Sequence, residues 1–152
     1  MTEIKYREAT VMDLPVLVSL DREYFADTAW PIEQFREEIS GATRKFLVGE
    51  IDKQIVTYAG AFIPSVGGEA DLMTVAVNPK YRRQGIAKYL IAELENWAKS
   101  KGGNAMMLEV DVGNDEAIAL YSKLGYEKLN IRKNYYGYGK DAQIMLITHT
   151  LS

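Results

Sequence analysis

The stretch that decides the fold runs from residue 72 to residue 87 and reads Leu-Met-Thr-Val-Ala-Val-Asn-Pro-Lys-Tyr-Arg-Arg-Gln-Gly-Ile-Ala. Residues 72–77 are nearly all apolar, which is typical of a strand buried on both faces. Asn78-Pro79 ends that strand, and a basic turn leads to Gly85, where the apolar spacing of an amphipathic helix begins. The stretch therefore predicts a strand–turn–helix unit with a glycine where the helix starts.

The basic turn is a candidate anion site. The first backbone N–H groups of a helix have no partner within the helix and carry a partial positive charge. Gly85 lets a phosphate approach the backbone closely, and Arg82 and Arg83 lie beside it in the sequence. The alternative is that Gly85 only begins a helix and that the arginines are a solvated patch. The pattern matches neither a Walker loop nor a Rossmann glycine motif.

Outward from this stretch, hydrophobic periodicity predicts the mixed α/β order β-α-α-β-β-β-α-β-α-β-β. No linker rich in Pro, Ser or Gly divides the chain, so residues 1–152 are predicted to form a single domain. Glu37-Glu38 is expected on a solvated helix face. The expected helices are 10–25, 31–39, 85–101 and 114–123, and the expected strands are 4–7, 46–51, 54–63, 72–77, 105–110, 127–135 and 142–151.

Composition argues against several functional classes. The 152 residues include no cysteine, which excludes disulfides, thiolate metal sites and acyl-cysteine intermediates. His149 is the only histidine, so a histidine-based triad or metal cluster is not expected. A net charge of −3 lacks the basic excess of nucleic-acid binders. No apolar run approaches the ~20 residues that span a bilayer, and residues 1–13 resemble no signal peptide. We therefore expect a cytoplasmic protein with no metal, nucleic-acid or membrane partner.

Arg82-Arg83-Gln84-Gly85-Ile86-Ala87 resembles the Arg/Gln-x-x-Gly-x-Gly/Ala motif with which the GNAT superfamily of N-acetyltransferases binds the pyrophosphate of acetyl-CoA. Val75-Ala76-Val77-Asn78-Pro79 resembles the family strand whose backbone pairs with the pantetheine arm, and residues 114–126 resemble its late helix and Leu-Gly-Phe/Tyr turn. The resemblance spans most of the chain. It implies an α/β fold with a central mixed, mostly antiparallel sheet, flanking helices and two splayed central strands. The acetyl-CoA contacts it implies are Val75, Ala76, Val77, Arg82, Arg83, Gln84, Gly85, Ile86, Ala87, Lys88 and Asn114.

A narrower resemblance covers Leu108-Glu109-Val110 and residues 114–126, 131–136 and 141–145. These segments are similar to bacterial ribosomal-protein-alanine N-acetyltransferases, in which the position of Glu109 is the general base and that of Tyr121 the general acid. This resemblance implies acetyl transfer to the α-amine of a protein or peptide N-terminus, a ribosomal protein among the partners, by direct attack in a ternary complex. Asp111-Val112-Gly113 departs from the usual Arg-Ala-Ser, which leaves the acceptor preference open.

Each catalytic candidate also has a structural interpretation. Judged from the residues alone, Glu109 is more often a strand-end ion-pair partner, and Tyr121 is more often a core aromatic on the apolar face of its helix. Acyl transfer to an amine requires a proton acceptor, a proton donor for the thiolate and a hydrogen bond to the oxyanion. A backbone N–H of strand 75–77 is the expected donor to the oxyanion.

Aromatic residues are the candidates for binding the acceptor. One is Trp30, in the connection between the first two helices, and the others are Tyr135, Tyr136 and Tyr138, in a loop that contains glycines. The alternative for this loop is an ordinary hairpin with its aromatic rings packed on the sheet. Asp27 is a further candidate, for contact with a substrate ammonium.

Two other functions stay open at this point. One is a small-molecule amine acetyltransferase that acts on a polyamine or an antibiotic-like amine. The other is a non-catalytic acyl-CoA-binding module, because a fold does not fix a function. The presence of both Glu109 and Tyr121 argues against the second.

Overall fold

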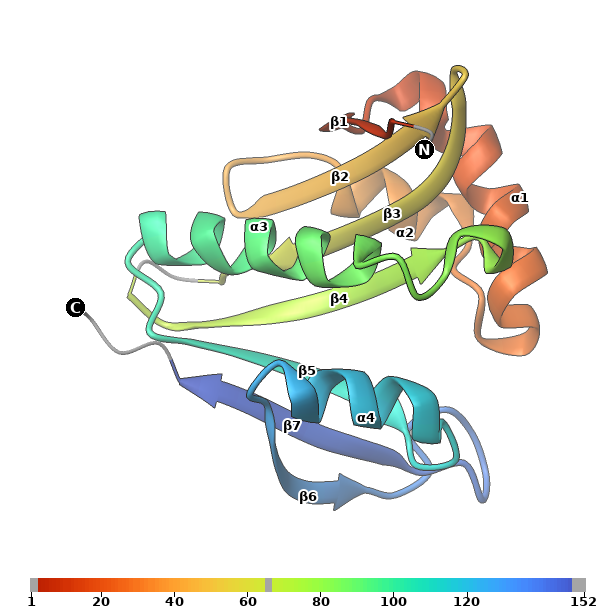
Figure 1. The fold of residues 1–152 in the computed structure, drawn as a ribbon. Coiled ribbons are helices and arrows are strands. Elements are labelled where there is room, and N and C mark those ends of the chain that lie inside the picture. The colour runs from red at the N-terminus through yellow and green to blue at the C-terminus, as the bar shows by residue number, and fades with distance from the viewer. Residues whose placement is uncertain (1–2, 65–66, 149–152) are drawn as a thin grey trace.

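The computed structural model describes residues 3–64 and 67–148, and one sheet of seven strands runs through them (Figure 1). The strand order is β1-β2-β3-β4-β5-β7-β6, and within the described ranges only β4 and β5 pair in parallel. The predicted mixed, mostly antiparallel sheet is confirmed. The strands are β1 Lys5–Glu8, β2 Arg44–Ile51, β3 Gln54–Phe62, β4 Glu69–Val77, β5 Ala105–Asp111, β6 Glu127–Arg132 and β7 Ala142–Thr148. His149 and the end of the predicted last strand lie outside the described residues.

The helices cover both faces of this sheet (Figure 1). They are α1 Leu14–Phe25, α2 Ile32–Glu38, α3 Ile86–Ser100 and α4 Asp115–Lys123, with short 3-10 turns at Val11–Asp13, Ala26–Thr28 and Pro79–Tyr81. Helices α1 and α2 pack over one apolar cluster that includes Phe35 and Tyr58, and α3 packs over a second that includes Leu90 and Met106. The predicted element order is confirmed. None of the described helices has the length and apolar character that a bilayer span requires.

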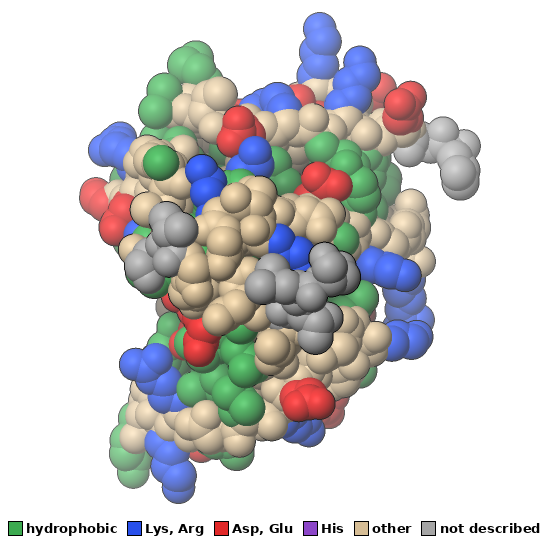
Figure 2. All heavy atoms as spheres, turned by 90° about the vertical axis from the view of Figure 1, so that its left-hand side faces the viewer, with side chains coloured by type: hydrophobic (Ala, Val, Ile, Leu, Met, Phe, Trp, Pro, Cys, Tyr) green, Lys and Arg blue, Asp and Glu red, His purple; other side chains and the backbone are tan. Residues whose placement is uncertain are grey.

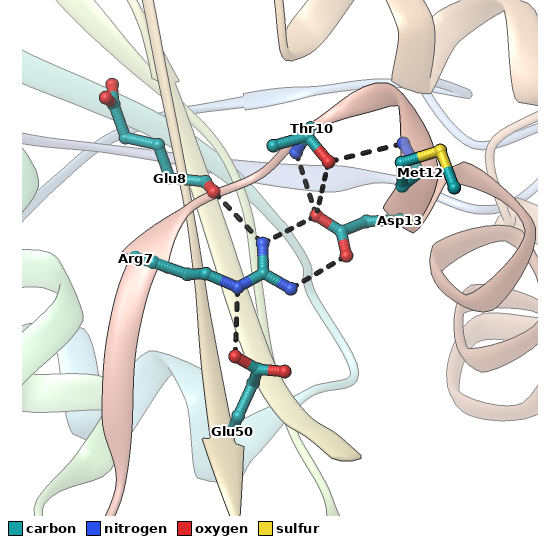
Figure 3. A network of polar contacts seen from close by, with 6 residues as sticks. All are labelled: Arg7, Glu8, Thr10, Met12, Asp13 and Glu50. Atoms are coloured by element: carbon teal, nitrogen blue, oxygen red, sulfur yellow. Dashed lines mark hydrogen bonds and ion pairs between the residues drawn. The ribbon is translucent and has the colours of Figure 1, made fainter. Parts of the chain in front are cut away.

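A polar network fixes the start of α1 (Figure 3). The Arg7 guanidinium donates to both carboxylate oxygens of Asp13, at 2.8 and 2.9 Å, and to Glu50 at 2.9 Å. Asp13 also accepts from the backbone N–H of Thr10 at 2.8 Å, so the two residues form a capping box. The hydrogen bond from Arg7 is the main reason why the pKa of Asp13 is lowered. The network joins β1 and β2 to the helix that delivers side chains to the site described below.

The two central strands separate along their length. β4 and β5 pair only between residues 69–71 and 105–107, and beyond that point they diverge, as Figure 1 shows. A β-bulge interrupts β4, because Gly60 pairs with Thr74 while the next residue of β3 pairs with Leu72, so Met73 is the extra residue. The edge of β4 that faces β5 therefore has backbone N–H and C=O groups without a strand partner beyond Asp71.

Two sequence-based expectations about burial are wrong. Residues 72–77 were predicted to be buried on both faces, but only Leu72 and Ala76 are fully buried. The other four side chains of this run are partly exposed, where β4 and β5 diverge.

Glu38, predicted to be solvated, is buried with 4% of its side chain exposed and forms an ion pair with Arg44. The Arg44 charge compensates part of the cost of burying that carboxylate.

Figure 2 shows the end of the molecule where β4 and β5 begin, which is the left-hand side of Figure 1. Lysine, arginine and acidic side chains are interspersed over this face, with apolar side chains between them. Among the described residues, this face shows no continuous basic surface of the kind that binds the phosphate backbone of a nucleic acid.

Candidate active site

Two adjoining cavities fill the opening between β4 and β5. The first, of about 290 Å³, runs along β4 to the start of α3 and is called the α3 arm here. The second, of about 210 Å³, lies along β5 under the α1–α2 connection and is called the β5 arm. The two arms have five lining residues in common, which mark the place where they meet. These shared residues are Phe25, Val75, Asn114, Ala117 and Tyr121.

The α3 arm contains nearly all the residues predicted to contact acetyl-CoA. Gln84 is the exception, because it does not line either arm. Three cationic side chains and one anionic side chain, Glu116, belong to the lining, so the arm carries an excess of positive charge. The predicted residues found there are Val75, Ala76, Val77, Arg82, Arg83, Gly85, Ile86, Ala87, Lys88 and Asn114.

The turn into α3 is held in a shape that needs glycine. Asn78 caps the 3-10 turn by accepting from Lys80 N at 3.0 Å, and Arg82 Nε donates to the Val77 carbonyl at 3.2 Å. Gly85 has a φ of +79°, in the left-handed region that glycine tolerates best. A Cβ built on Gly85 would meet no atom within 4 Å, so the backbone there borders open space at the N-terminus of a long helix. This is the geometry in which backbone N–H groups bind phosphates.

Helix α1 adds two residues to the α3 arm that the sequence did not single out, Tyr24 and Phe25. The Tyr24 hydroxyl is buried and has no hydrogen-bond partner within the described part of the chain. Burial and the Glu23 charge raise the pKa of Tyr24, while Arg82 and the Asn78 side chain oppose that rise. The Asn78 amide is thus close enough to influence the phenol, but no hydrogen bond of normal geometry joins them. In the sequence, Tyr24 is indistinguishable from a core aromatic.

Glu109 fits both of its interpretations. Its side chain lines the β5 arm and is 24% exposed. It also pairs with Arg132 at 3.4 Å, and the Tyr135 hydroxyl donates to its other oxygen at 3.2 Å. The Tyr136 hydroxyl donates to the Glu109 backbone carbonyl at 3.2 Å. A carboxylate held by one cation and one phenol, yet open to a cavity, is placed to accept a proton from a bound amine or water.

Tyr121 lies where the two arms meet. It projects from α4, lines both cavities and packs against Tyr126 with ring centroids 5.9 Å apart. Burial raises the pKa of Tyr121 to about 12, so its phenol is protonated at neutral pH. Asn114, beside it, caps α4 by accepting from Ala117 N at 3.1 Å. The structural and the catalytic interpretation of Tyr121 are compatible. Its apolar ring can pack against Tyr126 while its polar hydroxyl serves as a hydrogen-bond donor.

Asp21 is a third side chain from α1 that reaches the site. It is buried, accepts from the Tyr58 hydroxyl at 2.5 Å and from the Trp30 backbone N–H at 2.8 Å, and lines the β5 arm. Burial raises the pKa of Asp21, and these two hydrogen bonds oppose the rise. The sequence signal was the interruption of the apolar stripe of α1 by an acid. Asp21, Glu109 and Asp111 bring three carboxyl groups to the β5 arm, whose lining includes no lysine or arginine.

Only some of the residues that were predicted to bind the acceptor substrate lie at the cavities. Trp30 and Tyr136 line the β5 arm, and Tyr135 reaches it through its hydrogen bond to Glu109. Tyr138 is 98% exposed and lines neither arm. Asp27 is also outside both cavities, and its carboxylate lies 3.8 Å from the Lys140 ammonium. Within residues 3–64 and 67–148, no three acidic or histidine side chains cluster as metal ligands would.

Comparison with known proteins finds relatives over most of the chain. The chain is 32% identical over 136 residues to the [ribosomal protein bS18]-alanine N-acetyltransferase of Escherichia coli K12, covering 90% of this chain and 88% of that protein. The crystal structure of the E. coli ribosomal-protein-S18-alanine N-acetyltransferase superposes with a TM-score of 0.85 and 27% identity, covering 99% of this chain and 96% of that one. A protein of Mycobacterium leprae is 33% identical over 142 residues, which is 90% of this chain but only 38% of that protein.

The family comparison agrees with these relatives. The model of the acetyltransferase (GNAT) family matches residues 14–126, a range that runs from the start of α1 to the turn after α4 and includes both catalytic candidates. The resemblance read from the motifs at Arg82–Ala87 and Asn114–Tyr126 is confirmed. The chain therefore belongs to the GNAT family of acetyltransferases.

Proposed function

We propose that this protein transfers the acetyl group of acetyl-CoA to the α-amine of a protein or peptide N-terminus while both substrates are bound. The observation that carries the proposal is the meeting of two oppositely charged arms at Val75 and Tyr121. The cationic α3 arm suits the phosphates of acetyl-CoA, and the carboxyl groups of the β5 arm attract an ammonium group. The thioester and the amine then meet at the junction.

The residues of the α3 arm fit acetyl-CoA. The open space at Gly85 admits a phosphate to the backbone, and Arg82, Arg83 and Lys88 supply compensating charge. The edge of β4 beyond Asp71, which has no strand partner, offers N–H and C=O groups to the amides of the pantetheine arm. In this proposal an N–H of the same edge stabilises the oxyanion that forms from the acetyl carbonyl.

Two side chains would assist the reaction, one as a proton acceptor and one as a hydrogen-bond donor. The amine nitrogen bonds to the acetyl carbon, and the carbon–sulfur bond breaks. The proton lost by the amine passes to Glu109, directly or through a water, and Tyr121 donates a hydrogen bond to the departing sulfur. An α-amine, with a pKa of about 7.7–8.0, is easier to deprotonate than a lysine side chain at about 10.4. The chemistry therefore favours an N-terminal acceptor.

The E. coli relative supports an acceptor of this class, because its name specifies an alanine of ribosomal protein bS18. A ribosomal protein is accordingly the partner that we would test first. One observation favours a second candidate. Asp111 lines the β5 arm at the position where the resemblance leads one to expect arginine, and its extra negative charge would also attract a small polyamine.

A panel of acceptors should separate these functions. We expect thiol release from acetyl-CoA with a short peptide that begins with alanine, and little with the same peptide after its N-terminus is blocked, even when it contains lysine. Spermidine and an aminoglycoside test the small-molecule alternative, and greater turnover of either would contradict the proposal. Binding of acetyl-CoA with turnover of no acceptor in the panel would indicate a non-catalytic module.

Glu109→Gln should lower kcat/KM for the alanine peptide about tenfold at neutral pH, because the amide keeps the shape but accepts no proton. This is less than a general base typically contributes, since a water can relay the proton. The loss should shrink as the pH rises above about 8, where the α-amine is already neutral. A pH–rate profile of both proteins checks this.

Arg132→Gln is the matched control, because it removes the ion pair and leaves the carboxylate. If Glu109 were only a structural partner, both variants would lower the melting temperature similarly and leave the pH profile parallel to that of the wild type. That result would remove Glu109 from the mechanism.

A further inference from the structure

The carboxyl group of Asp21 takes no part in the proton transfers proposed above, although it is the most deeply buried carboxyl group of the β5 arm. Its residue is 2% exposed. Oδ1 accepts from the Tyr58 hydroxyl at 2.5 Å, and Oδ2 accepts from the Trp30 backbone N–H at 2.8 Å. These bonds compensate the cost of burying the acid and leave little of its surface for direct contact with a substrate. Its two partners therefore indicate what Asp21 does.

The first partner belongs to the connection between α1 and α2, residues 26–31, which forms one wall of the β5 arm. Thr28 and Trp30 line the arm from this connection. Ala26 begins it with a φ of +46°, which is unfavourable for a residue that has a Cβ. A backbone of this kind keeps its shape only where other contacts hold it. The hydrogen bond from Trp30 N–H to Asp21 is such a contact, because it fastens the far end of the connection to α1.

The second partner belongs to the central sheet. Tyr58 is fully buried on β3 and is paired with Ala76 of β4, which lines the α3 arm. The Tyr58 ring also packs against Phe35, the residue on which the Trp30 ring lies with centroids 5.1 Å apart. Asp21 thus joins a wall of the β5 arm to the strands beside the α3 arm, and it fixes the position of one relative to the other.

We propose that Asp21 is a positioning residue, which holds the α1–α2 connection in the shape that receives the acceptor before the acceptor arrives. This inference rests on the proposed function, because it takes the β5 arm as the acceptor site. Asp21 acts through the Trp30 N–H and not by its own contact with the acceptor. A wall that is already ordered spares the acceptor the cost of ordering it on binding, so Asp21 should affect acceptor binding more than acetyl-CoA binding.

Two substitutions of Asp21 test the proposal. Asp21→Ala leaves the Trp30 N–H without its acceptor, and it should raise the KM for the alanine peptide about tenfold at saturating acetyl-CoA. The Kd of acetyl-CoA should not change. Asp21→Asn keeps an oxygen that accepts from the same N–H, so its KM should lie within about twofold of the wild type. Steady-state kinetics and titration calorimetry measure these values. An equal rise in KM for both variants would show that the charge of Asp21 acts on the acceptor, and would overturn the proposal.

Tyr58→Phe is the matched control for stability. It removes the other hydrogen bond of the same carboxyl group and leaves the one from Trp30. It should lower the melting temperature, as Asp21→Ala does, because each variant loses a buried hydrogen bond. The peptide KM of Tyr58→Phe should stay near that of the wild type. A rise similar to that of Asp21→Ala would mean that lost stability explains both results, and would overturn the positioning role.

Hydrogen exchange of the wild type keeps the proposal testable even if Asp21→Ala fails to fold. The Trp30 amide should exchange slowly in the ligand-free protein, and an added alanine peptide should slow it little further. Exchange as fast as in an unstructured peptide would overturn the proposal. If the wild type turned over no peptide N-terminus, the proposed function would fail and this inference with it. Turnover by the wild type with the same KM for Asp21→Ala would overturn only the role of Asp21.

Discussion

Gly85→Glu is expected to abolish measurable acetyl-CoA binding, with Kd raised more than about a hundredfold, while the protein remains folded. The glutamate would place a side chain and a negative charge in the open space beside the first turn of α3. Charge–charge repulsion with the pyrophosphate and loss of the close backbone approach act in the same direction. Titration calorimetry measures the loss, and a thermal melt checks the fold.

Two control variants separate the causes of this loss. Gly85→Ala introduces only a Cβ at a φ of +79°, so it measures the backbone strain of about 1–2 kcal/mol without the charge. Gly41→Glu is matched for both strain and charge, because Gly41 has a φ of +96° and open space around it, but it lies outside both arms. Unchanged affinity in a folded Gly85→Glu protein would contradict the assignment of the phosphate site.

The sequence predicted the parts of the site that depend on local chain geometry. A buried strand, an Asn-Pro break, a basic turn and a glycine before an apolar stripe describe one continuous backbone path, and the structure has that path from β4 to α3. The predicted strands 46–51 and 54–63 are another local feature, because the two residues between them, Asp52 and Lys53, form a tight turn with positive φ. Local signals of this sort are carried by neighbouring residues alone.

The rest of the site depends on contacts between distant segments, which no local pattern encodes. Asp21 and Tyr24 line the cavities from α1, a helix far from β4 and β5 in the sequence. Their sequence signals were an acid in an apolar stripe and a tyrosine typical of a core. Glu38 was misjudged for the same reason, because its ion-pair partner, Arg44, comes from a different element. Tyr138 is an aromatic residue of the kind expected to bind the acceptor, but its side chain is exposed to solvent and lines neither arm.

The separation of β4 and β5 also could not be predicted from local sequence patterns. Each strand has an ordinary apolar sequence. Their parallel pairing ends after residues 71 and 107, while β4 continues to pair with β3 and β5 with β7. The partly exposed side chains of β4 follow from that separation. An apolar run that is buried on one edge and open on the other cannot be distinguished in sequence from a fully buried strand.

Tyr121→Phe should lower kcat about a hundredfold with little change in acetyl-CoA Kd or melting temperature. A phenol with a pKa of about 12 is a weaker acid than a thiol at about 8.5, so complete proton transfer to the CoA thiolate is uphill. Tyr121 should therefore act mainly by donating a hydrogen bond as charge develops on sulfur. This places the expected loss at the lower end of the usual 10²–10⁴ range for an acid–base group.

The pH dependence follows from the same pKa. Because Tyr121 stays protonated up to about pH 12, the wild type should lose no activity to ionisation of this group between pH 7 and 10, and the ratio of wild-type to Tyr121→Phe kcat should stay constant over that range. Tyr126→Phe, next to it in the core, controls for packing and should reduce stability instead of kcat. A near-normal kcat with a lowered melting temperature for Tyr121→Phe would make Tyr121 a core residue. The hydrogen bond to the departing sulfur would then need another donor, and Asn114 is the other polar side chain among the five residues that line both arms.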